Sequence, residues 1–284
     1  MAATRIGAVA ANFGRDLDRC VNKVTRIITD ARDAGVGLLV LPHATLGGYL
    51  GDLAHPDPRA LPPPLQESSE ELATIIRWAG DMVICLGYTE VAVVDGAALT
   101  YNTAVCMNGD GVLGRHRKVH QPLGEREATQ PGGSFDAFDT PLGRIGMLID
   151  YDKTFPEAAR SLALDGAALV ACLSAWPASV TNRAERMSAD RQSRLFDIYD
   201  SARAAENQII WVSSNQTGAM GSLRFLGQAK VVGPGGDVAA RTQGKGGMAL
   251  ADFDIAAEVA RSRRTLSHLQ ERVPAAYRET VEVV

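Results

Sequence analysis

The stretch Gly143-Arg-Ile-Gly-Met-Leu-Ile-Asp-Tyr-Asp-Lys-Thr-Phe-Pro-Glu157 decides the fold, because it joins a buried strand to a helix through a sharp turn. Residues 144–149 form an apolar run of the length typical of a buried strand. The Thr-Phe-Pro-Glu sequence at 154–157 has the spacing of a capping box with threonine as the N-cap, which predicts a helix over residues 156–164. Open α/β sheets bind ligands where their strands end, so Asp150 is predicted to lie at such an edge.

Composition and charge indicate an ordinary globular protein. Of the 284 residues, 46% are hydrophobic and 22% are charged, and the formal net charge is −4. This charge gives no electrostatic reason to expect nucleic acid or a membrane surface as a partner. No apolar run approaches the ~18 residues of a membrane span, so we expect no membrane association. The first five residues lead straight into a strand, so we expect no signal peptide.

The cysteines indicate a reducing compartment rather than a disulfide framework. They are scattered along the chain without a C-x-x-C pair, and we therefore expect a cytoplasmic protein. Cys172 ends an apolar run and could be imagined as a nucleophile. A cysteine inside Leu-Val-Ala-Cys-Leu is, however, typical of a small core residue. The four cysteines are Cys20, Cys85, Cys106 and Cys172.

Hydrophobic periodicity and turn residues predict strand–helix pairs at both ends of the chain, with a run of strands between them. This order predicts an α/β fold with a two-layered β core and helices outside. No repeat or linker divides the chain, so residues 1–284 are expected to form one domain with a polar tail from about residue 261. The expected helices cover residues 16–34, 67–79, 156–164, 187–207 and 255–262, and the expected strands cover residues 5–11, 37–42, 82–94, 99–108, 112–117, 144–149, 167–173, 208–213, 224–232, 238–243 and 248–253.

Three polar side chains directly follow apolar strands of this pattern. His43 follows residues 37–42, Lys118 follows the strand that ends at residue 117, and Asp150 follows the strand of the opening stretch. Strand ends gather at one edge of a sheet, so we expect these three side chains to meet there.

The opening stretch resembles the nucleophile elbow of the carbon–nitrogen hydrolase (nitrilase) superfamily. That family has an apolar strand, then Cys-Tyr-Asp, then a helix opened by Phe-Pro-Glu. This chain keeps Tyr151, Asp152 and Phe155-Pro-Glu157, but it has Asp150 where the family has its cysteine. Further passages resemble the family in the same order, from about residue 5 to residue 277: Leu41-Pro-His43, Arg117-Lys-Val-His120, Arg203-Ala-Ala-Glu-Asn207, Ser214-Asn215 and Gly227-Gln-Ala-Lys-Val-Val-Gly-Pro-Gly-Gly236.

The resemblance implies a four-layer αββα sandwich that assembles into a homodimer or a higher homo-oligomer, with no cofactor and no bound metal. The helices 156–164 and 187–207 would face the partner subunit, and the tail would cross it. The family's nucleophile, base, lysine and second glutamate correspond here to Asp150, His43, Lys118 and Glu125. Glu125 is preferred to Glu127 because it lies seven residues before Gly132, as in the family.

The pocket of the family implies two further residues. Tyr151 would donate its backbone N–H to a developing oxyanion, and Trp176 lies where the family lines its substrate pocket. We therefore expect a small-molecule ligand at this position.

Asp150 changes the chemistry that the resemblance implies. A carboxylate is a weak nucleophile toward an amide, and its product would be an anhydride, which is uphill from the amide. Two function classes stay open: an atypical hydrolase for a small amide-, nitrile- or carbamoyl-like molecule with His43 as base, and a pseudoenzyme with a ligand-binding or regulatory role. A metal site of His43 and two carboxylates is disfavoured, because Lys118 would place a positive charge beside the ion.

Overall fold

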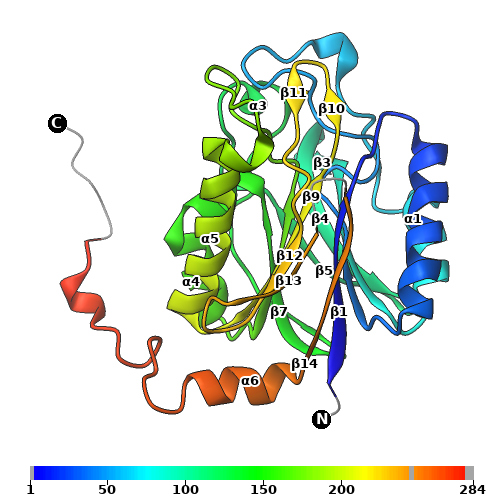
Figure 1. Cartoon of the computed structure of the whole chain (residues 1–284). Coiled ribbons are helices and arrows are strands. Elements are labelled where there is room, and N and C mark those ends of the chain that lie inside the picture. The colour runs from blue at the N-terminus through cyan, green and yellow to red at the C-terminus, as the bar shows by residue number, and fades with distance from the viewer. Residues whose placement is uncertain (1–2, 243–245, 279–284) are drawn as a thin grey trace.

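The computed structural model describes residues 3–242 and 246–278, and its strands form one continuous sheet that folds into two facing halves (Figure 1). One half has the order β5-β4-β3-β2-β1 and the other has the order β9-β8-β7-β6. Strand β14 pairs with β1, and β12 pairs with β9 and β13. The strands are β1 Thr4–Ala11, β2 Leu38–Val40, β3 Val83–Val94, β4 Ala97–Asn108, β5 Gly111–Arg117, β6 Phe138–Thr140, β7 Gly143–Ile149, β8 Leu169–Ser174, β9 Ile210–Gln216, β12 Lys230–Val232, β13 Val238–Arg241 and β14 Gly247–Phe253, with the small pair β10 Ala219–Met220 and β11 Leu223–Arg224 apart.

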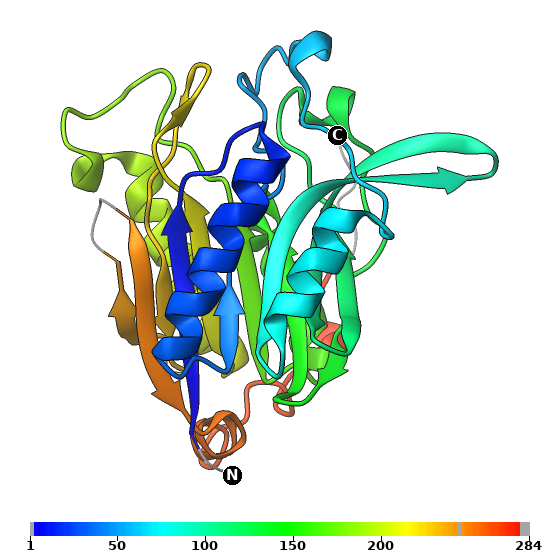
Figure 2. The same cartoon turned by 90° about the vertical axis from the view of Figure 1, so that its right-hand side faces the viewer.

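Helices cover the outer faces of both halves. Helices α1 and α2 lie against the half that contains β1 to β5, and α4 and α5 lie against the half that contains β7 to β9 (Figures 1 and 2). Figure 2 also shows the hairpin of β3 and β4 projecting beyond the body. The helices are α1 Leu17–Asp33, α2 Glu70–Ala79, α3 Glu125–Ala128, α4 Pro156–Leu164, α5 Arg191–Asn207 and α6 Ile255–Ser262.

The alternation of side chains along the strands explains why the sheet halves stack. In β1, Ile6 and Ala8 point into the core between the halves, whereas Val9 packs under the helices on the outer face. In β7, Met147 points into the same inner core and Leu148 packs under α4 and α5. Because successive side chains of a strand face opposite ways, strands that are apolar throughout are buried on both faces. The result is the expected αββα arrangement of four layers.

The two halves are joined as a sheet at one corner. Strands β1 and β9 run parallel and pair only through Ala10 with Asn215 and Ala11 with Gln216. Elsewhere the halves face each other across the inner core. The strand ends at this corner therefore bring loops from both halves to one edge of the molecule.

Several expected elements differ from the structure. The capping box at Thr154 was wrong: residues Asp150–Thr154 form a 3₁₀ turn, and Phe155 is the N-cap of α4 with no side-chain hydrogen bond to the helix. Threonine was unable to act as the cap because the tight turn that starts at Asp150 continues through it.

The expected helix over residues 187–207 is interrupted. A 3₁₀ turn covers Met187–Ala189, and Asp190 then caps α5 by accepting the backbone N–H of Gln192 at 2.8 Å. A side chain that captures an N–H in this way starts a new helix rather than continuing an old one.

The expected strand over residues 224–232 was also wrong, because the structure divides it between β11 and β12 with a loop between them. Residues 118–140, for which no helix or strand was expected, contain α3 and β6. The strand expected over residues 238–243 is β13, and Gln243 lies outside the described residues.

The described part of the tail leaves the body after α6 and extends on the side of α4 and α5 (Figure 1). Its Leu266, Val273 and Tyr277 are 58%, 60% and 51% exposed. In residues 3–242 and 246–278, no helix is both long and apolar enough to cross a membrane.

Helix α4 provides a test of the layer that covers the elbow. Leu162 of α4 is fully buried in the layer between the helices and the sheet, whereas Leu164 of the same helix is 50% exposed. Leu162→Ala should lower the free energy of unfolding by about 2–5 kcal/mol, because it leaves a cavity in a packed layer. Leu164→Ala should change it by less than about 0.5 kcal/mol. Urea denaturation measures both, and similar values for the two variants would contradict this packing.

Candidate active site

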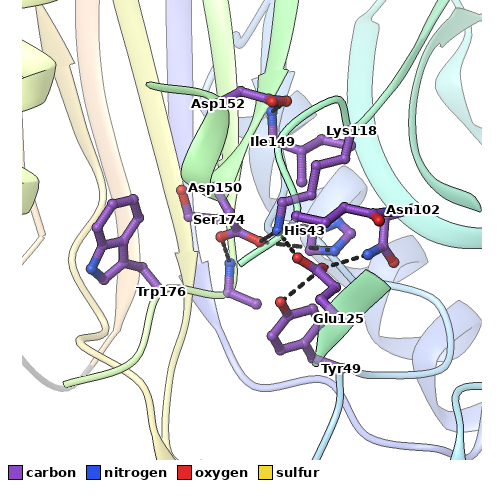
Figure 3. A network of polar contacts seen from close by, with 12 residues as sticks. His43, Tyr49, Asn102, Lys118, Glu125, Ile149, Asp150, Asp152, Ser174 and Trp176 are labelled. Atoms are coloured by element: carbon purple, nitrogen blue, oxygen red, sulfur yellow. Dashed lines mark hydrogen bonds and ion pairs between the residues drawn. The ribbon is translucent and has the colours of Figure 1, made fainter. Parts of the chain in front are cut away.

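The strand ends bring the sequence-predicted residues together (Figure 3). His43 follows β2, Lys118 follows β5 and Asp150 follows β7, so the three come from both halves of the sheet. Asp150 Oδ2 lies 3.5 Å from Lys118 Nζ and 3.9 Å from His43 Nε2. All three residues are 5% exposed or less. The expectation that they meet at one edge agrees with this geometry.

Asp150 has an unusual backbone conformation. Its φ is +46°, a left-handed value that aspartate tolerates better than most residues. This turn raises the side chain away from β7 and into the site. Its Oδ1 accepts the backbone N–H of Ala175 at 2.5 Å, so the carboxylate is fixed from the end of β8 as well.

Lys118 is held by a buried carboxylate. Its Nζ donates to Glu125 Oε2 at 2.6 Å, and Glu125 Oε1 accepts from Tyr49 Oη at 2.8 Å and from Asn102 Nδ2 at 2.5 Å. Burial lowers the pKa of Lys118, but the charges of Glu125 and Asp150 outweigh that effect and raise it above its usual value. Lys118 is therefore a fixed ammonium at the site.

Glu125 is the glutamate that reaches the site, and Glu127 is exposed. The choice of Glu125 from the sequence thus agrees with where the structure places the two. Burial raises the pKa of Glu125 above its usual value, and the adjacent Lys118 ammonium offsets only part of that effect. Its three hydrogen-bond donors favour the ionised carboxylate.

His43 is buried without a hydrogen bond. Neither of its ring nitrogens has a partner, and burial lowers its pKa from 6.5 to about 4, although Asp150 acts in the opposite direction. The imidazole is therefore neutral near pH 7. Gln216 of β9 holds the backbone of this loop, because its Nε2 donates to the carbonyl oxygens of His43 and Ala44, both at 3.0 Å.

Gly87 of β3 gives His43 its space. A Cβ built at this position would lie 2.8 Å from both the Cα and the Nδ1 of His43. Any larger residue would push the imidazole out of its place. The position of the ring thus depends on a glycine in the neighbouring strand.

Asp152 ties the elbow to the segment that carries Lys118. Its carboxylate accepts the backbone N–H groups of Val119 at 3.2 Å, His120 at 2.9 Å and Ile149 at 3.3 Å. The side chains of His116 and His120 bind it at 2.9 and 3.0 Å. Burial alone would raise the pKa of Asp152, but these hydrogen bonds hold it well below its usual range. His120, which also stacks on Phe155, therefore has a structural contact rather than a place in the pocket.

A pocket of about 210 Å³ opens beside Asp150. Asp150 and Lys118 contribute to its inner end, and Tyr151 and Trp176, which the resemblance implied as pocket residues, are among those that line it. Trp176 Nε1 donates to Gln192 Oε1 at 3.0 Å, which orients the indole against α5. Asn215 Oδ1 accepts the backbone N–H of Trp176 at 2.8 Å, so β9 also holds this wall.

Sequence reasoning missed Tyr49, Asn102 and Gln216. Tyr49 lies in a Gly- and Pro-rich loop whose sequence gives no element, and Asn102 lies within a strand whose pattern marks only its apolar residues. A polar residue inside an otherwise buried strand was the available signal for Asn102.

Cys172, which we weighed as a second nucleophile, is fully buried, and burial raises the pKa of its thiol to about 12. A thiol in that state is not ionised near pH 7, so it behaves as a core residue. Within the described parts of the chain, no three His, Cys, Asp or Glu side chains are grouped so that they could hold a metal ion.

His43 gives the fold a pH dependence that can be measured. The unfolded chain binds a proton at His43 below about pH 6.5, whereas the folded chain binds it only near pH 4, so stability is complete above pH 6.5 and falls toward pH 4. Each pKa unit corresponds to ~1.36 kcal/mol, so the loss attributable to His43 is roughly 3 kcal/mol.

His43→Gln, which has no titratable ring, should lack this part of the acid loss. Urea denaturation of both proteins at pH 7 and pH 4 measures the difference, since the other titrating groups are common to the two. Equal acid losses in the two proteins would show that His43 is not buried in its neutral form.

Comparisons with known proteins agree with this fold. The carbon–nitrogen hydrolase family model matches residues 5–264. An (R)-stereoselective amidase of a Pseudomonas species is 33% identical over 233 residues, which cover 79% of this chain and 76% of the amidase. A probable nitrilase of Schizosaccharomyces pombe is 35% identical over 141 residues, which cover only about half of each chain, 49% and 47%. The crystal structure of a carbon–nitrogen hydrolase from Helicobacter pylori G27 superposes with a TM-score of 0.82 over 97% of both chains at 22% identity, a likeness of fold. The match to the family model over most of its length shows that this chain belongs to the carbon–nitrogen hydrolase family.

Proposed function

We propose that the protein hydrolyses a C–N bond of a small amide-, nitrile- or carbamoyl-like molecule without forming a cysteine thioester. Asp150 occupies the position at which the family has its cysteine, and His43 occupies that of the glutamate base. The family supplies the reaction class, since relatives of this chain include proteins named omega-amidase, in Xenopus laevis, and N-carbamoylputrescine amidase, in Arabidopsis thaliana. Asp150 and His43 change the reaction route, because neither can form a cysteine thioester.

One observation carries the proposal: the ring of His43 is buried, neutral and without a hydrogen bond, and it lies 3.9 Å from Asp150, which lines an open pocket. Leaving buried polar atoms unpaired costs about 1–3 kcal/mol each, and such a cost is common at functional sites. A hydrogen bond between His43 and Asp150 would have removed the cost for one ring nitrogen, but His43 Nε2 and Asp150 Oδ2 are 3.9 Å apart, which is too far for one. The ring is free to accept a proton.

In this route the nucleophile is water. His43 takes a proton from water, and the hydroxide adds to the substrate carbon as Lys118 stabilises the developing oxyanion. Asp150 stabilises the imidazolium that forms 3.9 Å away. The C–N bond then breaks, and the proton passes from His43 to the leaving nitrogen. Asp150 forms no bond to carbon, which avoids the anhydride.

The alternative is a pseudoenzyme that binds a ligand or regulates a partner. The low pKa of His43, about 4, favours this alternative, because an efficient general base has a pKa near the operating pH. Under this alternative, the pocket and the fixed Lys118 remain as a binding site. The two functions differ in whether His43 matters for product formation.

Ammonia release from a panel of small carboxamides, carbamoyl compounds and nitriles tests the proposal. The wild-type protein should turn over at least one class of substrate, and His43→Ala should reduce the rate at least about 100-fold, the usual contribution of a general base. His55→Ala changes an exposed histidine of a surface loop and should leave the rate unchanged. Full activity in His43→Ala would rule out the proposed base.

Mass spectrometry of the same mixtures separates the water route from a covalent one. No acyl adduct should accumulate on the wild-type protein. An adduct on Asp150 or Cys172 would overturn the water route. The double variant Asp150→Cys with His43→Glu should regain the family's residues and trap a thioester with an amide substrate, because Lys118 and Glu125 are already in place.

We also propose that the protein is a homodimer whose contact lies on α4, α5 and the tail. Ile198 of α5 is 52% exposed and Leu164 of α4 is 50% exposed. The described part of the tail, which contains further exposed apolar residues, runs on the side of these two helices (Figure 1). A set of exposed apolar side chains on one face is typical of an interface.

Sedimentation velocity at micromolar concentration tests the dimer. The wild-type protein should sediment as a dimer, and Ile198→Asp should shift it toward the monomer, because the change places a charge in the contact. Val93→Asp, at the 75% exposed tip of the β3–β4 hairpin, should leave the dimer intact. A wild-type protein that sediments as a stable monomer would contradict the proposal.

A further inference from the structure

The charges at the inner end of the pocket do not balance. Lys118 faces two carboxylates, and it lies 2.6 Å from Glu125 Oε2 but 3.5 Å from Asp150 Oδ2. Tyr49 and Asn102 also donate to Glu125, which stabilises that carboxylate as an anion. One ammonium thus serves two anions, and its shorter contact goes to Glu125. The negative charge of Asp150 is therefore less well compensated by Lys118 than that of Glu125.

Neither His43 nor Lys153 makes up the difference. Lys153 Nζ lies 5.1 Å from the centre of the Trp176 ring, but it pairs with Asp200 at 2.8 Å. His43, at 3.9 Å from Asp150, is neutral near pH 7 because burial lowers its pKa to about 4. Among the described residues that line the pocket, Lys118 and Asp150 are the only charged ones. Asp190 is another buried carboxylate near the pocket, and it accepts from the backbone N–H and the hydroxyl of Ser179, a lining residue.

The walls of the pocket also suit a cation. The rings of Tyr49, Tyr151 and Trp176 line it, together with apolar side chains that include Leu123 and Val180. Aromatic faces attract cations, and the attraction grows when water is excluded. A cavity of roughly 150 Å³ is enough for benzene, so a pocket of about 210 Å³ has room for a ring with a small polar group.

We propose that the pocket binds a small molecule with a positively charged, planar C–N group, an amidinium or a guanidinium, placed against Asp150 with its apolar body on Trp176 and Tyr151. Parallel N–H groups of such a cation match the oxygens of a carboxylate. Asp150 Oδ2, which faces the lysine at 3.5 Å, has acceptor capacity to spare, whereas Oδ1 already accepts from Ala175. This inference rests on the proposed function in that it concerns the ligand of the same pocket, and it adds a positive charge to that ligand.

Three probes of one shape and different charge test the inference. Benzamidinium, benzamide and benzoate share a phenyl ring with a small planar head group, and the first is the cation. At pH 7.5, isothermal titration calorimetry should show benzamidinium binding at least about 10-fold more tightly than benzamide, with benzoate weakest. Benzamide or benzoate binding as tightly as benzamidinium overturns the inference, and so does the absence of measurable benzamidinium binding.

Substitution of the anion separates Asp150 from the rest of the pocket. Asp150→Asn keeps the size and the left-handed turn, and it should remove the preference for benzamidinium over benzamide. Asp139→Asn is the matched control, because the Asp139 side chain is 84% exposed and pairs with Arg144 on the surface. A preference that survives in Asp150→Asn overturns the inference. If Asp150→Asn fails to fold by circular dichroism, the order of the three probes on the wild-type protein decides.

The inference and the proposed function can fail separately. The probe order is a binding measurement that needs no turnover. Equal probe affinities together with ammonia release from amides would reject only the cationic ligand. The expected probe order without any ammonia release would reject only the hydrolytic function and would leave a cation-binding pseudoenzyme.

Discussion

The buried carboxylate of Asp152 holds together the two segments on which the site depends. It accepts backbone N–H groups from Ile149, at the end of β7, and from Val119 and His120, just after Lys118. These segments come from opposite halves of the folded sheet, so this contact ties the segment that carries Lys118 to the strand that leads into Asp150. Several hydrogen-bond donors around a buried carboxylate stabilise its ionised form. The geometry of the candidate site therefore depends on Asp152, a residue that does not line the pocket.

The balance of buried charges also determines the properties of the residues that line the pocket. A buried lysine is tolerable when carboxylates surround it, and Lys118 has two of them. The resemblance of the opening stretch implies a carboxylate in place of a thiol at position 150, and this carboxylate is a second anion beside the paired Lys118 and Glu125. His43 does not offset it, because its ring is neutral. Both the route that we propose and the ligand that we propose follow from that surplus of negative charge.

The sequence predicted most of the fold because the strands are apolar on both faces and the helices have marked ends. Helix 156–164 was predicted with its observed bounds, and the meeting of three strand ends followed from a general property of sheets. The errors lie where side chains compete for backbone groups. Asp190 captures the N–H of Gln192 and starts a helix, which a hydrophobic pattern does not record.

The partners of the site residues were harder to predict. Tyr49 reaches Glu125 from 76 positions away, and Gln216 reaches His43 from 173 positions away. Neither contact has a local signal, since each depends on how the loops at the corner of the sheet pack. The sequence could indicate which side chains stand at the strand ends, but not which of them would remain without a partner.

The left-handed backbone of Asp150 has a consequence for how this site can change during evolution. Residues with branched β-carbons are strained in that conformation, whereas short polar residues tolerate it. The turn therefore filters substitutions by shape and admits several functional groups. A new reactive group can enter at this one position while the strand, the helix and the walls of the pocket keep their structure, so the chemistry of the site can diverge faster than the architecture that carries it.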